Sequence, residues 1–289
     1  MLNRRTLFIT GASRGIGLAI ACRAARDGAN VALAAKTATP HPRLPGTIYT
    51  AAEAVEAAGG NALPLILDVR DEQAVRAAMA ATAKQFGGVD ILINNASAIS
   101  FTATPDTDAR RFDLMHQINA RGTYVCTREA LGYLRASAAA HVLNISPPLD
   151  LSPHWFGPHV AYSIAKFGMS LCTLGHAEEF RRYGIAVNSL WPISTIDTAA
   201  VRTHLANLSR TSRKPEIMAD AAYAIVSKPP VAATGQFYLD EVVLRSEGID
   251  DFSRYAVDPA AAVTADYFVN EEVLDGLPTK FMRLNSLPG

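Results

Sequence analysis

The sequence predicts a single doubly wound α/β domain built on a seven-stranded, mostly parallel sheet with helices on both faces. Compact apolar runs alternate with Ala-rich stretches of helical spacing through most of the 289 residues, which is typical of strands joined by crossover helices. The apolar runs lack an in/out alternation, as expected of strands covered on both faces. No repeat or low-complexity linker divides the chain. We therefore expect one domain over 1–289, with 240–289 as an extension that packs on it or on a neighbouring subunit.

Each element follows from its local pattern. Strands are expected at 6–10, 30–36, 62–67, 89–94, 140–146, 185–190 and 235–240, and helices at 15–27, 47–58, 71–86, 108–136, 161–182 and 216–227. Right-handed crossovers between successive parallel strands then give the doubly wound arrangement. Residues 37–46 hold three prolines, which exclude a helix and predict a longer ordered loop after the second strand.

Composition excludes several classes of partner. Basic and acidic residues number 27 each, so the formal net charge is zero, and no field of one sign favours nucleic acid or an anionic membrane. The three cysteines (Cys22, Cys126, Cys172) are scattered, which suits a reducing compartment and argues against a disulfide framework or a zinc site. The longest stretches without Asp, Glu, Lys or Arg, 91–105 and 151–165, are too short to span a membrane. We expect a soluble, cytoplasmic protein.

A glycine-rich turn joins the first strand to the first helix. Glycine permits a tight turn and lets backbone N–H groups approach a pyrophosphate closely, and the helix N-terminus adds its partial positive charge. A purely structural turn is the alternative, but the position between the first strand and the first helix favours dinucleotide binding. The candidate cofactor-binding residues here are Gly11, Ser13, Arg14, Gly15, Ile16 and Gly17.

The end of the second strand distinguishes NAD from NADP. A carboxylate there would bind the ribose 2′-hydroxyl and repel a 2′-phosphate, but this strand ends in Lys36. Lys36 and Arg14 together supply two cations for charge-assisted bonds to a phosphate. The alternative for Lys36 is a solvated strand end. We expect the cofactor to be NADP(H).

Asp68 and Val69 close the third strand. The Asp68 carboxylate stands where it can accept a hydrogen bond from an adenine amino group. The alternative is that Asp68 caps the helix that begins at 71.

Tyr162 and Lys166 stand four residues apart at the start of the helix expected over 161–182, so they share one face. A phenol with a pKa near 10 is a poor acid or base at neutral pH. A neighbouring ammonium group favours the phenolate and lowers that pKa towards the working range. The pair becomes specific because a glycine-rich loop lies about 150 residues upstream.

Taken together, these motifs resemble those of the short-chain dehydrogenase/reductases over almost the whole chain. The matching segments are Thr10–Gly17, Asp68, Asn94–Ser97, Asn119, Tyr162–Lys166 and the segment of Pro192. The resemblance implies a Rossmann-type domain that transfers a hydride between NADP(H) and a carbonyl or secondary alcohol of a small, fairly apolar substrate. It also implies a homodimer or homotetramer formed through the helices at 108–136 and 161–182.

The resemblance assigns roles to individual residues. Tyr162 would donate and accept the proton, Lys166 would hold the nicotinamide ribose and tune Tyr162, and Asn119 would keep the water of a proton relay. Asn95 would line the cofactor cleft, and Thr195 or Thr198, after Pro192, would contact the nicotinamide amide. Pro192 is followed by Ile193, where the family prefers glycine.

One departure affects the catalytic set. The substrate-orienting serine of the family lies thirteen residues before the tyrosine, a position that holds Leu149 here. Aligning the strand end instead puts Pro147 at the serine position, with Ser146 beside it. We treat Ser146 as a candidate catalytic residue whose hydroxyl lies within about 5 Å of the Tyr162 hydroxyl. The alternative is a strand-end hydroxyl that caps nearby backbone.

Two further features remain open at this stage. His154 and His159 precede Tyr162 without a third ligand nearby, so we expect no metal. The absence of a serine at the usual spacing leaves a second functional class: a protein that binds NADP(H) as a sensor or assembly partner with little turnover. Substrate loops vary freely on one fold, so the sequence does not identify the substrate.

Overall fold

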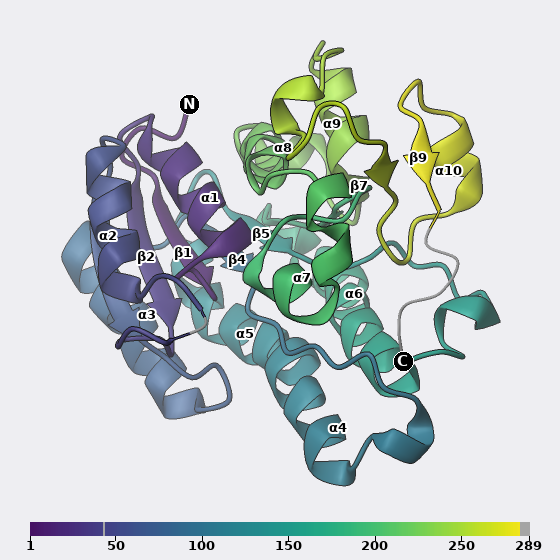
Figure 1. Ribbon diagram of the computed structural model, residues 1–289. Coiled ribbons are helices and arrows are strands. Elements are labelled where there is room, and N and C mark those ends of the chain that lie inside the picture. The colour runs from purple at the N-terminus through teal and green to yellow at the C-terminus, as the bar shows by residue number, and fades with distance from the viewer. Residues whose placement is uncertain (43, 284–289) are drawn as a thin grey trace.

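The computed structural model describes residues 1–42 and 44–283, and its centre is one parallel sheet (Figure 1). The sheet has seven strands in the order β3-β2-β1-β4-β5-β6-β7, and every neighbouring pair runs parallel. The strands are β1 (Thr6–Thr10), β2 (Asn30–Ala35), β3 (Asn61–Ile66), β4 (Ile91–Asn94), β5 (His141–Asn144), β6 (Ala186–Trp191) and β7 (Phe237–Leu239). The predicted seven-stranded doubly wound α/β fold is confirmed. The strand order reverses next to β1, where such folds place their ligand crevice.

The helices fall close to their expected positions, with one interruption. They are α1 (Gly15–Ala25), α2 (Ile48–Ala57), α3 (Glu72–Phe86), α4 (Ala109–His116), α5 (Gly122–Leu134), α6 (Val160–Phe180), α7 (Ala199–His204), α8 (Glu216–Val226), α9 (Asp240–Ser246) and α10 (Glu271–Asp275). The single helix expected over 108–136 is wrong in detail, because a π-helical turn at Gln117–Arg121 separates α4 from α5. The sequence analysis missed the short helices α7, α9 and α10.

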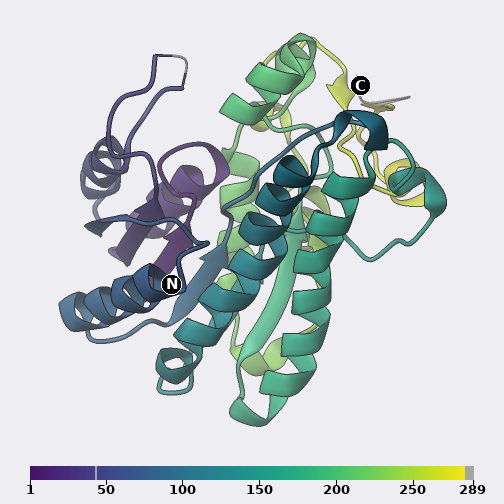
Figure 2. The same ribbon diagram turned by 90° about the horizontal axis from the view of Figure 1, so that it is seen from below.

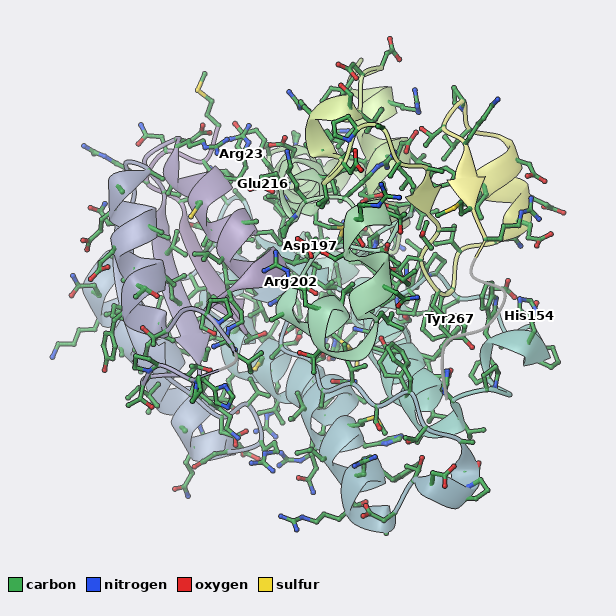
Figure 3. The ribbon with its side chains drawn as sticks, viewed as in Figure 1. Arg23, His154, Asp197, Arg202, Glu216 and Tyr267 are labelled. Carbon is green, nitrogen blue, oxygen red and sulfur yellow. The ribbon has the colours of Figure 1, made fainter. Side chains whose placement is uncertain are left out.

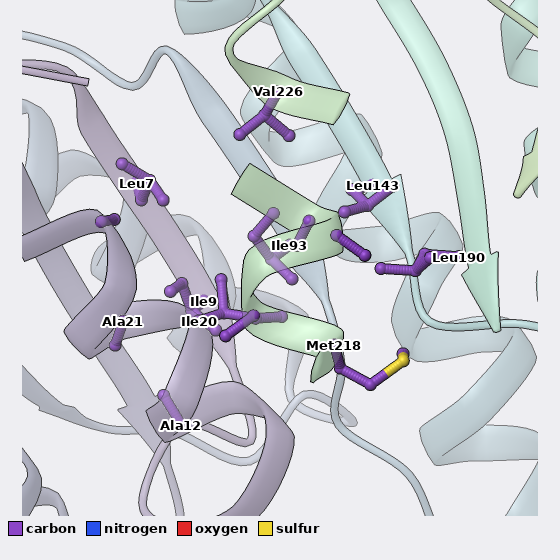
Figure 4. Close-up of a cluster of buried hydrophobic side chains, with 14 of the residues drawn as sticks. Leu7, Ile9, Ala12, Ile20, Ala21, Ile93, Leu143, Leu190, Met218 and Val226 are labelled. Atoms are coloured by element: carbon purple, nitrogen blue, oxygen red, sulfur yellow. The ribbon is translucent and has the colours of Figure 1, made fainter. Parts of the chain in front are cut away.

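Side chains of one strand alternate between two apolar layers. On β1, Leu7 and Ile9 pack with residues of α1 and α8, whereas Phe8 packs on the opposite face with residues of α3, α5 and α6. Figure 4 shows the first layer, where Ile20 of α1 and Met218 of α8 lie over the sheet. Both faces of the central strands are therefore covered by apolar side chains, which explains why these strands are continuous apolar runs in the sequence.

The described parts of the proline-rich loop, 37–42 and 44–46, project from the sheet edge in Figure 2 and contact the glycine-rich turn. The Arg14 guanidinium donates to the carbonyl oxygens of Pro45 (Nε, 2.8 Å) and Gly46 (Nη2, 2.9 Å). Gly46 has a φ of +84°, and a Cβ there would lie 2.9 Å from the Ser13 carbonyl oxygen. Thr47 then starts α2 with a reciprocal capping box to Thr50. The loop and the turn are therefore one packed unit.

The described part of the extension, 240–283, contacts the rest of its own chain. It adds a two-stranded sheet of β8 (Val263–Thr264) and β9 (Phe281–Met282). Its backbone bonds to the connection between β6 and α7: Thr195 N–H donates to Thr264 O (3.0 Å), and Asp266 N–H donates to Ile193 O (3.0 Å). The extension therefore covers the carboxyl end of β6, where the cleft of this fold opens.

A buried cluster of charged side chains fixes the extension to the rest of the chain. Arg213 and Glu241 are 1% and 0% exposed, and their Nη1 and Oε2 atoms lie 2.6 Å apart. Arg245 donates to Oε1 of the same Glu241 at 2.6 Å, and the hydroxyl of Thr279 donates to it at 2.5 Å. One buried carboxylate thus joins α9 to the segments on both sides of it.

No helix in the described part of the chain is long and apolar enough to cross a membrane.

Candidate active site

A single cleft of about 660 Å³ runs along the carboxyl ends of the parallel strands. It brings together the predicted cofactor residues and the predicted proton-transfer pair, which lie about 150 positions apart in the sequence. The predicted residues that line it are Gly11, Ser13, Arg14, Gly15, Ile16, Lys36, Asp68, Val69, Asn95, Tyr162, Lys166, Pro192 and Thr195. Three predicted site residues, Gly17, Asn119 and Ser146, are not among the lining residues.

Glycine is required at the turn for two different physical reasons. Gly11 and Gly15 have φ values of +66° and +58°, a region that residues with a Cβ rarely adopt. Gly17 is needed for space, because a Cβ there would lie 2.6 Å from Nδ2 of Asn95 and 2.8 Å from the Gly11 carbonyl oxygen.

Asn95 braces this turn from below. Its Nδ2 donates to the carbonyl oxygens of Thr10 (2.9 Å) and Gly11 (3.1 Å), while its own N–H donates to the Thr10 hydroxyl (3.0 Å). The side chain also lines the cleft. Asn95 therefore fixes the shape of the turn as well as part of the cleft floor.

Helix α1 begins at Arg14 without a side-chain cap. Its first N–H groups are thus left without an intrahelical partner at the cleft. This is the arrangement by which helix N-termini bind phosphate groups.

The end of β2 carries more opposite charge than the sequence suggested. The Lys36 ammonium is 60% exposed and lies 3.3 Å from a carboxylate oxygen of Asp68. Asp68 also accepts from Nε (3.0 Å) and Nη2 (2.6 Å) of Arg70, and these bonds hold the pKa of Asp68 well below its ordinary value. Helix α3 is capped by Asp71, which accepts from the N–H of Ala74. The alternative interpretation of Asp68 as the helix cap is therefore wrong.

Positive charge still predominates at this end of the cleft. Arg14 and Lys36 line it together with Asp68, whose carboxylate pairs with Lys36 and with Arg70. His41, from the proline-rich loop, lines the same region. The surplus of cations suits a doubly charged phosphate.

Tyr162 and Lys166 share the buried face of α6. Their exposed fractions are 4% and 3%. The Lys166 ammonium donates to the Ile145 carbonyl oxygen at 2.7 Å and lies 4.9 Å from the centre of the Trp191 ring. Burial lowers the pKa of Lys166 to about 7.

The expectation that Lys166 lowers the pKa of Tyr162 is wrong for this structure. Burial raises the pKa of Tyr162 above its ordinary value, and the Asp266 carboxyl raises it further. Removal from water disfavours the charged phenolate. Tyr162 is therefore a protonated phenol at neutral pH.

Asn119 lies in the π-helical turn and is fully buried. Its Oδ1 accepts from the N–H of Ala98 (2.8 Å), and its Nδ2 donates to the carbonyl oxygen of the same residue (3.0 Å). These paired bonds fix the segment after β4 against the helix. Such π-helical turns often occur at functional sites, where they displace backbone groups from the regular ladder.

The Ser146 hydroxyl is fully buried and has no hydrogen-bond partner among the described residues. Its neighbour Ile145 lines the cleft, and Ser146 does not. Burial off the cleft lining counts against contact with a substrate, while the predicted separation of about 5 Å from the Tyr162 hydroxyl stays a prediction.

The segment after β6 forms the far wall of the cleft. Thr195 is 2% exposed, and its hydroxyl lies 2.8 Å from that of Ser212. Thr198 caps α7, which the paired side chains of Asp197 and Arg202 (2.5 Å, Figure 3) hold in place. Ile193, at the position where the family prefers glycine, is fully buried.

Three segments contribute polar or aromatic lining residues that the sequence does not mark. Asp266 and Tyr267 come from the extension, Phe101 from the segment after β4, and His41 from the proline-rich loop. Tyr267 donates from its hydroxyl to the Trp155 carbonyl oxygen (3.1 Å), and its own carbonyl oxygen accepts from the Trp191 indole (2.7 Å). No spacing in the sequence indicates that the extension reaches the cleft.

The histidines before Tyr162 are not part of a metal cluster. No group of three or more His, Cys, Asp or Glu residues in 1–42 and 44–283 is arranged to hold a metal ion. Trp155 and Phe156 pack against the buried cluster that contains Tyr162 and do not line the cleft. These two aromatic residues therefore contribute to packing rather than to the cleft lining.

Comparison with known proteins places this cleft in a family. Residues 5–208 match the short chain dehydrogenase family. The chain is 56% identical over 267 residues to hydroxysteroid dehydrogenase-like protein 2 of Homo sapiens, and it is 55% identical over 279 residues to the protein of that name from Danio rerio. These matches cover 92% and 96% of the chain, but only 63% and 66% of the two relatives. The chain belongs to the short-chain dehydrogenase family and spans about two thirds of the length of these curated relatives.

Solved structures agree with this assignment. A dehydrogenase of Xanthomonas campestris is 54% identical with a TM-score of 0.92, covering 94% of this chain and 100% of that one. A short chain dehydrogenase of Mycobacterium thermoresistibile is 50% identical with a TM-score of 0.89, covering 93% of this chain and 96% of that one. The family is one of oxidoreductases that bind nicotinamide cofactors and act on small molecules.

Proposed function

We propose that the protein reduces a carbonyl group, or oxidises the corresponding secondary alcohol, of a small and fairly apolar substrate with NADP(H) as cofactor. One observation carries the proposal. The glycine-rich turn, the cations around Lys36 and the pair Tyr162 and Lys166 all line one continuous cleft of about 660 Å³. A cleft of this size suits a dinucleotide together with a small substrate.

The residues present fit the cofactor. The turn at Gly11 and Gly15, with the uncapped start of α1, would hold the pyrophosphate, and Lys36 with Arg14 would hold the 2′-phosphate. Asp68 and Val69 would contact the adenine, and Pro192 and Thr195 would contact the nicotinamide. When bound, the nicotinamide supplies or accepts the hydride.

The protonation state of Tyr162 supports its role as proton donor. At neutral pH the Tyr162 phenol carries the proton that the oxygen of a carbonyl undergoing reduction would accept. The ammonium group of Lys166 is held beside Ile145 and Trp191. There it would hold the nicotinamide ribose. Asn119 lies in the π-helical turn and holds the segment after β4 in place. It would also keep the water of a proton relay.

A homodimer or homotetramer is part of the proposal. Exposed apolar side chains gather on α5 and α6, including Tyr124, Ile164, Leu171 and Leu174. Solvent-facing apolar residues repeated along one helix pair are typical of a subunit interface.

The second candidate function is NADP(H) binding with little turnover. The observation that favours it is the burial of Ser146 away from the cleft lining, which leaves the usual serine role unfilled. The two candidates differ in one measurable property, which is turnover of a carbonyl compound.

The deciding experiment combines binding and turnover. NADPH and NADH are titrated against nicotinamide fluorescence, and NADPH consumption is then followed with a panel of aldehydes, cyclic ketones and aryl ketones. We expect tighter binding of NADPH and reduction of at least one apolar ketone. Tight NADPH binding without turnover of any compound in the panel would favour the second candidate, and absence of binding would refute both.

A further inference from the structure

The extension contributes a carboxyl group to the cleft that contains the proton-transfer pair. Asp266 lines the same cleft as Tyr162 and Lys166, although it lies 100 residues beyond them. Its N–H donates to the Ile193 carbonyl oxygen (3.0 Å), and the neighbouring Ala265 N–H donates to Met282 O (2.8 Å). The backbone on both sides of the carboxyl is therefore fixed, so Asp266 belongs to a rigid wall.

Aromatic contacts hold this wall against α6. The rings of Tyr162 and Phe268 are 6.1 Å apart and nearly parallel, and the rings of Phe167 and Phe268 are 5.3 Å apart, edge to face. Tyr267, labelled in Figure 3, bonds through its hydroxyl and its carbonyl oxygen to two other segments. A carboxyl presented between residues packed in this way has a defined position relative to the Tyr162 ring.

The serine that in this family supplies a second hydrogen-bond donor beside the tyrosine is not found in this cleft. The family's serine position holds Leu149 or Pro147, neither of which has a hydroxyl, and Ser146 is buried off the lining. A carbonyl oxygen that develops negative charge is stabilised strongly by a second donor held in place before the reaction.

We propose that Asp266, in its protonated form, is a catalytic residue that donates a hydrogen bond to the substrate carbonyl oxygen and so fills the role of the missing serine. The proposal rests on the proposed function, because it concerns the same carbonyl. Asp266 keeps its proton throughout. The proton that reaches the oxygen still comes from Tyr162, and the electron pair comes with the hydride.

The charges that face Asp266 are consistent with a neutral carboxyl. Burial raises its pKa well above the ordinary value, and the nearby Asp240 carboxyl at the start of α9 raises it further. Lys166 on α6 and the Tyr267 backbone N–H act in the opposite direction. Tyr162 carries no charge at neutral pH and does not oppose protonation. A carboxylic acid kept neutral by its surroundings is an effective donor to a developing oxyanion.

The first test needs no turnover. Aspartate carboxyl carbons are labelled with ¹³C, and the resonance absent from Asp266→Asn identifies Asp266 in the parent protein. We expect that resonance to titrate well above the ordinary range for aspartate. Titration near pH 4, the ordinary range for aspartate, would overturn the proposal and leave the proposed function untouched.

The second test uses turnover with cyclohexanone and acetophenone as probes. Asp266→Ala removes the donor, and we expect kcat to fall about a hundredfold, the usual scale for loss of one such donor. Asp266→Asn keeps an N–H donor, so we expect kcat within about threefold of the parent and no fall in activity at high pH, by the same principle. Asp258→Asn, on the same extension and paired with the exposed Arg210, is the matched control and should behave as the parent.

Three outcomes would overturn the assignment. One is an Asp266→Ala variant with normal kcat, and another is an equal loss in the Ala and Asn variants, which would indicate packing rather than donation. The third is a weaker NADPH affinity that accounts for the whole loss. A parent protein that binds NADPH and reduces neither probe argues against the proposed function, and the carbon-13 titration then still decides whether Asp266 can donate.

Discussion

Replacing Glu241 with glutamine tests how the wall of the cleft is held. Glu241→Gln removes the charge that pairs with Arg213, whose side chain is 1% exposed, and leaves that guanidinium buried without its partner. Breaking a buried pair from one side costs about 3–5 kcal/mol. We expect about 3 kcal/mol, because the nearby Asp240 carboxylate offsets part of the loss. For a domain of this order of size, that lowers Tm by about 6–12 °C.

The effect is asymmetric because Glu241 has a second cation. Arg213→Met leaves Glu241 bonded to Arg245, so we expect a smaller loss, about 1–2 kcal/mol by the scale for a buried hydrogen-bonded group. In the double variant no buried charge lacks a partner, since neither member of the pair remains. We expect its stability to lie within about 1 kcal/mol of the Arg213→Met variant, which gives a coupling energy of about 2–3 kcal/mol.

Guanidinium chloride unfolding at pH 7, followed by circular dichroism, measures all three variants. Glu178→Gln is the control: it removes an exposed partner of Arg181, 3.1 Å away, and should change stability by less than about 0.5 kcal/mol. The reasoning fails if Glu241→Gln costs no more than this control, or if the two single losses simply add in the double variant.

Four further predictions follow from the cleft itself. Lys36→Asp should shift preference from NADPH towards NADH in fluorescence titrations, because it reverses the charge facing the 2′-phosphate; equal affinities of the parent for the two cofactors would contradict the assignment. Tyr162→Phe should bind NADPH normally and lose at least about a hundredfold in kcat, whereas near-normal turnover would require another proton donor. Lys166→Met should bind NADPH more weakly yet raise Tm. Burial lowers the pKa of Lys166 to about 7, so the parent loses stability as pH falls from about 10 towards 7, and thermal melts at pH 7 and 9.5 should show that only the parent has this slope. Gly17→Ala should weaken NADPH binding at least about tenfold, since its Cβ would lie 2.6 Å from Nδ2 of Asn95; unchanged affinity in the same titration would show that the turn can give way.

The central strands were predictable because they are apolar runs covered on both faces, whereas the edge strand β3 is partly exposed. Most helices were predictable from their helical spacing. The exception is a local break that no residue type marks. Gln117–Arg121 contains no proline and only continues the helical spacing, so nothing in the sequence marks the π-helical turn. The short helices α7, α9 and α10 follow turns and take their stability from tertiary contacts that spacing does not report.

The candidate site was predictable where one motif holds both the residue and its surroundings. The glycine-rich turn and the Tyr162–Lys166 pair are of this kind. The direction of the Tyr162 pKa shift was not, because it depends on burial and on Asp266, a residue 104 positions away. Likewise, Lys36 reads as an unopposed cation in the sequence, and its partner Asp68 becomes a neighbour only when β2 and β3 pair.

The wall formed by the extension separates two tasks along the chain. The family match ends at residue 208, whereas Asp266 and Tyr267 of the cleft lining lie well beyond it. The proposed cofactor-binding residues thus lie within the family match, whereas part of the proposed substrate's surroundings lies in the last fifth of the chain. Exchange of the segment from 240 onward between homologues of this family should therefore transfer substrate preference while cofactor preference stays with the host. In such chimeras the transferred segment would have to form the same backbone hydrogen bonds to Ile193 and Thr195 that the extension forms here.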